Sequence, residues 1–185
     1  TERVLKAVAE ARCDLKIKRF GIENSNADFA AMNLEFIDGL ARFDLFVSGT
    51  MQGTVSLKLP GRHNVSNALA CLAAASRTGL DIKRALDVIG DFEGTNRRFT
   101  VLKEDAEACV VDDYAHHPTA IKAVLEAARH RFPGKRLIAV FEPHQHNRVL
   151  RLFDNFAEAL GVADEIHLTN IFRCRDKDED VAAVN

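Results

Sequence analysis

The rhythm of apolar and polar residues changes near residue 100, and this change predicts two regions. Before that point, apolar residues recur at helical spacing over residues 1–11, behind Thr1 as a helix cap. Shorter apolar runs follow, and their alternation predicts strands. The predicted strands cover residues 15–22, 24–37, 42–49 and 53–61, the last two joined as a hairpin through a turn at 49–53.

Two helices are expected to complete this first region. Residues 63–80 are rich in Ala and Leu, which favour helix, and Gly79 supplies a stop. Residues 81–92 form the second predicted helix, with Asp81 as its cap. The chain then passes through a loop into further strands.

The second region alternates strands and helices. Strands are predicted at residues 108–112, 135–143 and 165–171, and helices at 118–131 and 148–160. Continuous apolar strands separated by helices are typical of parallel pairing with right-handed crossovers. We therefore predict an α/β protein, with residues 1–99 in one domain and a Rossmann-like parallel βαβ domain over residues 100–185.

Polar chemistry follows the predicted strands of the second region. Ligands of open parallel sheets bind at the carboxyl ends of the strands, so these residues are expected to form one cleft. The first strand is followed by Asp112, Asp113, Tyr114, His116 and His117, the second by Glu142, His144, Gln145, His146 and Arg148, and the third by Thr169 and Asn170. In particular, Asp113, His116, His144 and Arg148 are predicted to converge on the same edge of the sheet.

The residue types at this edge leave several chemistries open. Four histidines with carboxylates invite a transition metal, although their spacing fits no helical metal motif. A site for an anionic or zwitterionic substrate is favoured, because Arg148 suits a carboxylate or phosphate and Asp113 suits hydroxyls or an ammonium. A purely structural alternative has Asp112 or Asp113 capping the helix that Pro118 opens.

Composition excludes some classes of protein. The formal net charge is −2 with both signs interspersed, so no basic stripe indicates nucleic-acid binding. No apolar stretch reaches the roughly 18 residues of a membrane span. The cysteines, at 13, 71, 109 and 174, show no CxxC spacing and fit a reducing, cytoplasmic setting, with Cys71 and Cys109 as small core residues. The charge-dense residues 173–180 are expected to be a solvated face or loop.

Four linked motifs resemble the Mur ligases, the amino-acid-adding enzymes of peptidoglycan synthesis. They are "LPGRHNVSNALACLAAA", "FEGTNRRF", "VVDDYAHHPTAIKAVLEAAR" and "RLIAVFEPHQHNR". The resemblance spans residues 15 to 172, and "DDYAHHPT" with F-x-P-H-x-x-x-R is most similar to the alanine-adding branch.

This resemblance implies a reaction and a set of partners. The family joins an amino acid, here L-alanine, to UDP-N-acetylmuramate, using ATP and Mg²⁺ and passing through an acyl phosphate. Residues 1–99 would be the latter part of a P-loop-type central domain, and residues 100–185 the first part of the C-terminal domain. The family's P-loop and magnesium ligands would lie upstream, because Gly134-Lys135 precedes a strand and cannot serve. The later strands would lie downstream, so this segment alone is expected to be inactive.

The resemblance also assigns site residues. His63, Asn64 and Asn67 match the adenine-contacting motif, and an Asn amide can donate to and accept from adenine. Arg98 matches an arginine that meets the nucleotide at the domain junction, and Asp113 an aspartate near the ribose or phosphates. Positions near the incoming amino acid and the acyl phosphate are matched by Tyr114, His116, His144 and Arg148.

Structural alternatives stand beside these assignments. Asn64 could cap the helix at 65–77, and Arg98 could be a surface residue whose role falls to Arg97. In many alanine-adding members of the family, arginine stands where this chain has Gln145. This chain therefore lacks one cation that could bind the amino-acid carboxylate, unless Arg151 or His146 compensates. Glycine, L-serine or a whole recycled peptide therefore stays open as the substrate, as do a non-catalytic nucleotide-binding module and a metal-dependent hydrolase.

Overall fold

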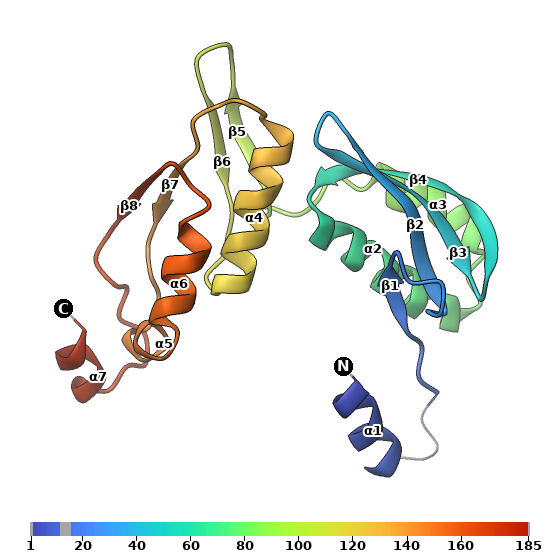
Figure 1. Ribbon diagram of the computed structural model, residues 1–185, viewed down its shortest axis with the longest axis horizontal. Helices are drawn as coiled ribbons and strands as arrows, with labels where there is room; N and C mark the ends of the chain where they lie inside the picture. The colour runs from blue at the N-terminus through green and yellow to red at the C-terminus, as the bar shows by residue number, and fades with distance from the viewer. Residues whose placement is uncertain (1, 12–15, 185) are drawn as a thin grey trace.

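The computed structural model describes residues 2–11 and 16–184, and it contains two α/β regions joined by a single connection (Figure 1). The helix predicted at the N-terminus is present as α1 (Glu2–Ala11), whereas its predicted cap, Thr1, lies outside the described residues. Of the strand predicted at 15–22, only β1 (Phe20–Ile22) forms, and residues 16–19 are not in a strand.

The first region is built on a four-stranded sheet in the order β1-β2-β3-β4. β1 pairs parallel to β2 (Phe29–Ile37), and the other neighbours pair antiparallel. β3 (Leu40–Val47) and β4 (Thr50–Pro60) form the predicted hairpin. The predicted turn at 49–53 is wrong, because Ser48 and Gly49 both take positive φ and close a tighter turn, which leaves residues 50–53 in β4.

Two helices lie along this sheet (Figure 1). α2 (Arg62–Ala75) runs into a short 3₁₀ turn and stops at Gly79, which is left-handed as expected. α3 (Ile82–Asp91) begins at Asp81, whose carboxylate accepts a hydrogen bond from the Lys83 N–H, so the predicted cap is confirmed. The core lies between the sheet and these helices, and five fully buried side chains form its centre: Phe43, Leu45, Val65, Leu69 and Leu72. Cys71 is exposed, which corrects its assignment to the core.

The second region begins with β5 (Thr100–Glu104), which pairs antiparallel to β6 (Cys109–Asp112). α4 (Pro118–Arg131) has the predicted bounds, and its N-cap is His117, which replaces the Asp112 or Asp113 cap considered above. β7 (Ile138–Phe141) and β8 (Glu165–Leu168) pair parallel, as predicted. The helix predicted at 148–160 breaks at Leu152 into α5 (His146–Arg151) and α6 (Phe153–Leu160), and α7 (Asp178–Ala183) follows the last strand.

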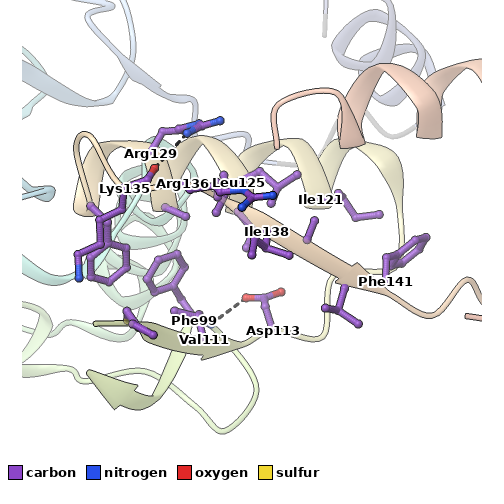
Figure 2. A pocket seen from close by; sticks show the side chains of 18 of the residues that line it. Phe99, Val111, Asp113, Ile121, Leu125, Arg129, Lys135, Arg136, Ile138 and Phe141 are labelled. Atoms are coloured by element: carbon purple, nitrogen blue, oxygen red, sulfur yellow. Dashed lines mark hydrogen bonds between the residues drawn. The ribbon is translucent and has the colours of Figure 1, made fainter. Parts of the chain in front are cut away.

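One predicted strand pairing is absent from the described residues. β6 uses one edge to pair with β5, while a cavity of about 650 Å³ lies between β6 and β7. Figure 2 shows this cavity, with Val111 and Phe99 on one side and Ile138 and Phe141 on the other. The continuous three-stranded parallel sheet expected from the sequence is therefore interrupted at this point.

α4 is fastened to the β7–β8 pair by a carboxylate. Asp164, just before β8, accepts hydrogen bonds from the Arg129 guanidinium at 2.6 Å and from the Leu137 N–H at 2.7 Å. The Arg129 hydrogen bond is the main reason that the pKa of Asp164 is lowered to about 2, and the Leu137 N–H adds to it. The carboxylate is thus favoured in its ionised form in the folded protein.

This arrangement predicts a pH dependence of stability. A carboxyl group whose pKa is lower in the folded than in the unfolded protein stabilises the fold above its unfolded pKa. That contribution should be lost as the pH falls from the ordinary value of 3.8 towards about 2. Asp164→Asn is therefore expected to lower the thermal midpoint at pH 7 and to match the parent protein near pH 2. An equal difference at both pH values would contradict this.

The two regions are joined by residues 92–99. On the side of the first region, Lys58 in β4 pairs with Glu93 at 3.4 Å. On the other side, the Phe99 N–H donates to Asp113 and the Tyr114 N–H donates to the Arg97 carbonyl, both at 2.8 Å. The last residues of the connection are therefore bonded to the second region.

The regions also touch directly. The turn between β2 and β3 meets the end of α4, where the rings of Phe36 and His130 lie 5.3 Å apart. Gly39, with φ +78°, sits so close that an added Cβ would come 2.3 Å from the Arg131 Cα. Only glycine fits both this conformation and this approach.

Candidate functional site at the strand ends

Aromatic and basic side chains gather where β6 and β7 end. The rings of His116 and His144 are stacked with their centroids 6.5 Å apart, and Tyr114 meets His116 edge-on at 5.2 Å. Arg148 reaches across from α5, and its guanidinium donates to the His116 carbonyl at 3.4 Å. The structure thus brings together His116, His144 and Arg148, three of the four residues that the strand-end argument predicted to converge.

Arg148 is held in place from its own loop as well. Its second guanidinium nitrogen donates to the Gln145 Oε1 at 2.8 Å. Gln145 takes φ +67°, which is uncommon for a residue other than glycine and is often found at functional sites. The residue that departs from the family pattern therefore positions the neighbouring arginine.

Of the two residues proposed to compensate for Gln145, His146 is unsuitable. It is only 6% exposed, and its Nδ1 lies 3.2 Å from the Asp176 carboxylate. A buried, paired ring cannot offer a cation to a substrate. Arg151 is exposed on the same helix.

Asp113 lies between this cluster and the connection to the first region. One carboxylate oxygen accepts the Phe99 N–H at 2.8 Å, and the other accepts the Ala115 N–H at 2.7 Å. The Phe99 bond is visible in Figure 2. Asp113 thus orders the turn that carries Tyr114 and His116 through these two backbone hydrogen bonds.

Arg97, the alternative to Arg98, has specific contacts in the same turn. Its guanidinium lies 5.1 Å from the centre of the Tyr114 ring and its Nε donates to Asp112 at 3.2 Å. Arg98 is exposed, and its charge reaches His63 in the first region. The structure therefore separates the two arginines: Arg97 contacts Tyr114 and Asp112, whereas the positive charge of Arg98 acts on His63.

His63 carries the clearest sign of a ligand in the first region. Its Nδ1 is buried and has no hydrogen-bond partner among the described residues. Burial lowers the pKa of the His63 ring; the negative charge of Asp113 opposes this shift and the positive charge of Arg98 adds to it. The ring is therefore neutral at pH 7, and its unsatisfied nitrogen suits a heteroaromatic or hydroxyl-bearing ligand.

Asn64 and Asn67 lie next to His63 at the start of α2. The Asn64 amide donates to the Pro60 carbonyl at 2.8 Å, and the Asn67 amide donates to Asn64 at 3.2 Å. Asn64 is not the helix cap, because α2 begins at Arg62 with Gly61 before it. The two amides form a short hydrogen-bonded chain in the same first turns of α2 that carry His63.

Over residues 2–11 and 16–184, no three His, Cys, Asp or Glu side chains are grouped so that they could hold a metal ion. Over the same residues, no helix is both long enough and apolar enough to cross a membrane.

Sequence reasoning missed Asp176. The alternating charges of residues 173–180 predicted a solvated face or loop. The Asp176 side chain is instead fully buried, because it turns inward against His146. No periodicity marks it, and only its position shortly after a strand end could have drawn attention.

Both regions of the chain are similar to domains of known proteins. Residues 1–75 match the Mur ligase middle domain, and residues 97–184 match the Mur ligase, glutamate ligase domain. A UDP-N-acetylmuramate–L-alanine ligase of Clostridium acetobutylicum is 37% identical over 183 residues, covering 98% of this chain and 39% of the relative. That of Caldanaerobacter subterraneus is 41% identical over 168 residues, covering 90% of this chain and 36% of the relative.

A solved structure agrees with the sequence matches. The crystal structure of the UDP-N-acetylmuramate–alanine ligase of Thermotoga maritima superposes with a TM-score of 0.72 at 26% identity, covering 95% of this chain and 43% of that one. The chain thus spans well under half the length of the relatives it matches. From both matched domains and the shared fold, the chain belongs to the Mur ligase family.

Proposed function

We propose that this chain is part of a cytoplasmic, ATP-dependent ligase that joins L-alanine to UDP-N-acetylmuramate in peptidoglycan synthesis. The observation that carries the proposal is the convergence of His116, His144 and Arg148 at the ends of β6 and β7. The names of the relatives at 37% and 41% identity support the choice of L-alanine. The proposal further divides the chain into domains at residues 1–99 and 100–185.

The nucleotide would be held from the first region. His63 offers the unsatisfied ring nitrogen, and Asn64 and Asn67 offer amides that can both donate and accept. Arg98 brings positive charge towards the same place, while Asp113 fixes the turn opposite. ATP is a substrate here. Its Mg²⁺ would be held by residues outside this chain.

The reaction would proceed by activating the muramate carboxylate. Transfer of the terminal phosphoryl group of ATP gives an acyl phosphate, the amine of alanine attacks its carbonyl carbon, and phosphate leaves as the amide bond forms. Arg148 would hold the alanine carboxylate or the developing negative charge. The stacked imidazoles of His116 and His144 can accept the proton that the amine must lose, and Tyr114 would line the pocket.

Phosphate release by the full-length protein tests this proposal. With ATP, Mg²⁺ and UDP-N-acetylmuramate, release is expected to depend on L-alanine, and residues 1–185 alone are expected to give none. Glycine, L-serine and the recycled tripeptide are tested in parallel. A strong preference for the tripeptide over L-alanine as the partner of UDP-N-acetylmuramate would favour a recycling ligase. Nucleotide binding with no release under any condition would favour a non-catalytic module.

A further inference from the structure

The segment after β8 lies alongside the loop that leads into α5, and the two are paired in parallel at Phe172 and His144. The Phe172 N–H donates to the Pro143 carbonyl at 2.7 Å, and the Gln145 N–H donates to the Phe172 carbonyl at 3.1 Å. The rings of His144 and Phe172 lie 5.2 Å apart. The loop that presents His144 and Arg148 is therefore bonded along its length to a segment far away in sequence.

This segment ends at a buried carboxylate. Asp176, whose side chain is 0% exposed, accepts a hydrogen bond from the Cys174 N–H at 3.1 Å, and so its own turn is ordered. It also accepts the Asn147 N–H at 3.4 Å and lies 3.2 Å from the His146 Nδ1. These last two partners are the first residues of α5.

α5 needs such a partner. Its N-cap, Gln145, makes no side-chain capping hydrogen bond, because the Gln145 Oε1 accepts from Arg148 instead. The N–H groups of a helix's first turn otherwise lack partners, and a carboxylate there also interacts favourably with the helix dipole. Asp176 supplies from another segment the cap that Gln145 does not provide.

Burial by itself would raise the pKa of Asp176. Hydrogen bonds from His146 and from the N–H groups of Cys174, His146 and Asn147 outweigh it, and the pKa is lowered overall. The buried group is therefore a carboxylate at neutral pH, as its capping geometry requires.

From these contacts we infer that Asp176 is a positioning residue, which fixes the start of α5 so that Arg148 points at the substrate carboxylate. Asp176 touches no reacting atom, and its effect passes through Asn147 and His146 to the Gln145–Arg148 pair. The inference deepens the proposed function and rests on it. The part of the inference that concerns the anchoring of α5 by Asp176 does not depend on the identity of the substrate.

Asp176→Asn in the full-length protein tests the inference, with Asp178→Asn as the matched control. Asp178 is two residues away, its side chain is 94% exposed and it pairs with Arg173, so Asp178→Asn removes the same charge from an exposed ion pair. A displacement of the reacting groups by about 1 Å can cost on the order of 100-fold in rate. Asp176→Asn is expected to lower kcat/KM for the amino acid about 10- to 100-fold, leaving KM for ATP unchanged, while Asp178→Asn stays at the parental level.

Two further measurements separate positioning from general loss of structure. In an Arg148→Lys background, Asp176→Asn should change kcat/KM by less than about 2-fold, because residues acting through one another are not additive. Amide hydrogen exchange at residues 145–148 should accelerate in Asp176→Asn but not in Asp178→Asn. An Asp176→Asn effect that is as large in the Arg148→Lys background, or unchanged exchange at these amides, would overturn the inference. The exchange readout holds even if the parental protein failed to turn over alanine, which would instead count against the proposed function.

Discussion

Arg148→Ala in the full-length protein is expected to reduce kcat/KM for the amino acid by about 100- to 1000-fold, the usual cost of removing a donor that stabilises charge in the transition state. Two hydrogen bonds hold the Arg148 guanidinium at the strand-end cluster. Gln145 holds one guanidinium nitrogen and the His116 carbonyl holds the other. Such preorganisation makes the charge effective, because little reorganisation is needed when the reaction occurs.

Steady-state kinetics with varied amino acid and saturating ATP measure this effect. Arg151→Ala is the matched control, since Arg151 lies on the same helix and is exposed. We expect it to leave kcat/KM within a few-fold of the parent, and Arg148→Lys to fall between the two because lysine cannot make the forked contacts of arginine. If the Arg151 and Arg148 variants lost activity equally, Arg148 would not be the residue that holds the carboxylate.

Phe43→Ala is expected to destabilise the first region by about 3 to 5 kcal/mol, the range found for replacing a buried Phe with Ala. Phe43 is 1% exposed, and it stands on the inner face of β3 opposite Val55. Phe43 belongs to the buried cluster between the sheet and α2, so its replacement by alanine would leave a large cavity. This loss is a large share of the stability of an ordinary domain.

Amide exchange of β3 reports this loss under native conditions, because the amides of a core strand exchange when the cooperative unit that contains them opens. The exchange free energies of the Phe43 and Leu45 amides should fall together in Phe43→Ala. Phe92→Ala serves as the control, as Phe92 is 50% exposed. Its effect should lie within about 0.5 kcal/mol, as for most exposed sites. Unchanged β3 protection in Phe43→Ala would show that this core is not a cooperative unit.

The helices and most strands could be predicted because their local signals agree with the final fold. Pro118 and the amphipathic residues that follow fix α4 over the predicted bounds, and Asp81 caps α3 as expected. Errors arose where two signals competed. Ser48 and Gly49 close the hairpin with a two-residue turn, although Gly53 also marks the stretch as loop-like. Leu152, an ordinary helix former, interrupts what periodicity suggests is one helix.

The strand-end cluster could be predicted because parallel topology places such residues on one edge. Its internal contacts could not. The sequence does not reveal that Gln145 takes a left-handed conformation and holds Arg148. Nor does it reveal that Asp176, within a run of alternating charges, is buried against His146. The contact of Asp176 joins chain segments that are distant in the sequence, and that of Gln145 depends on an uncommon backbone conformation, so local periodicity encodes neither.

The two ends of the connection between the regions are bonded to different regions. Glu93 is paired with Lys58 in the first region, whereas the turn from Thr95 to Phe99 is bonded to the second. Between them lies Gly94, with φ +99°. The turn that carries Arg98 is therefore held with the strand-end cluster, whereas His63 belongs to the first region. Any movement of one region against the other would change the distance between the Arg98 charge and His63, the two groups that the proposed function places at the nucleotide.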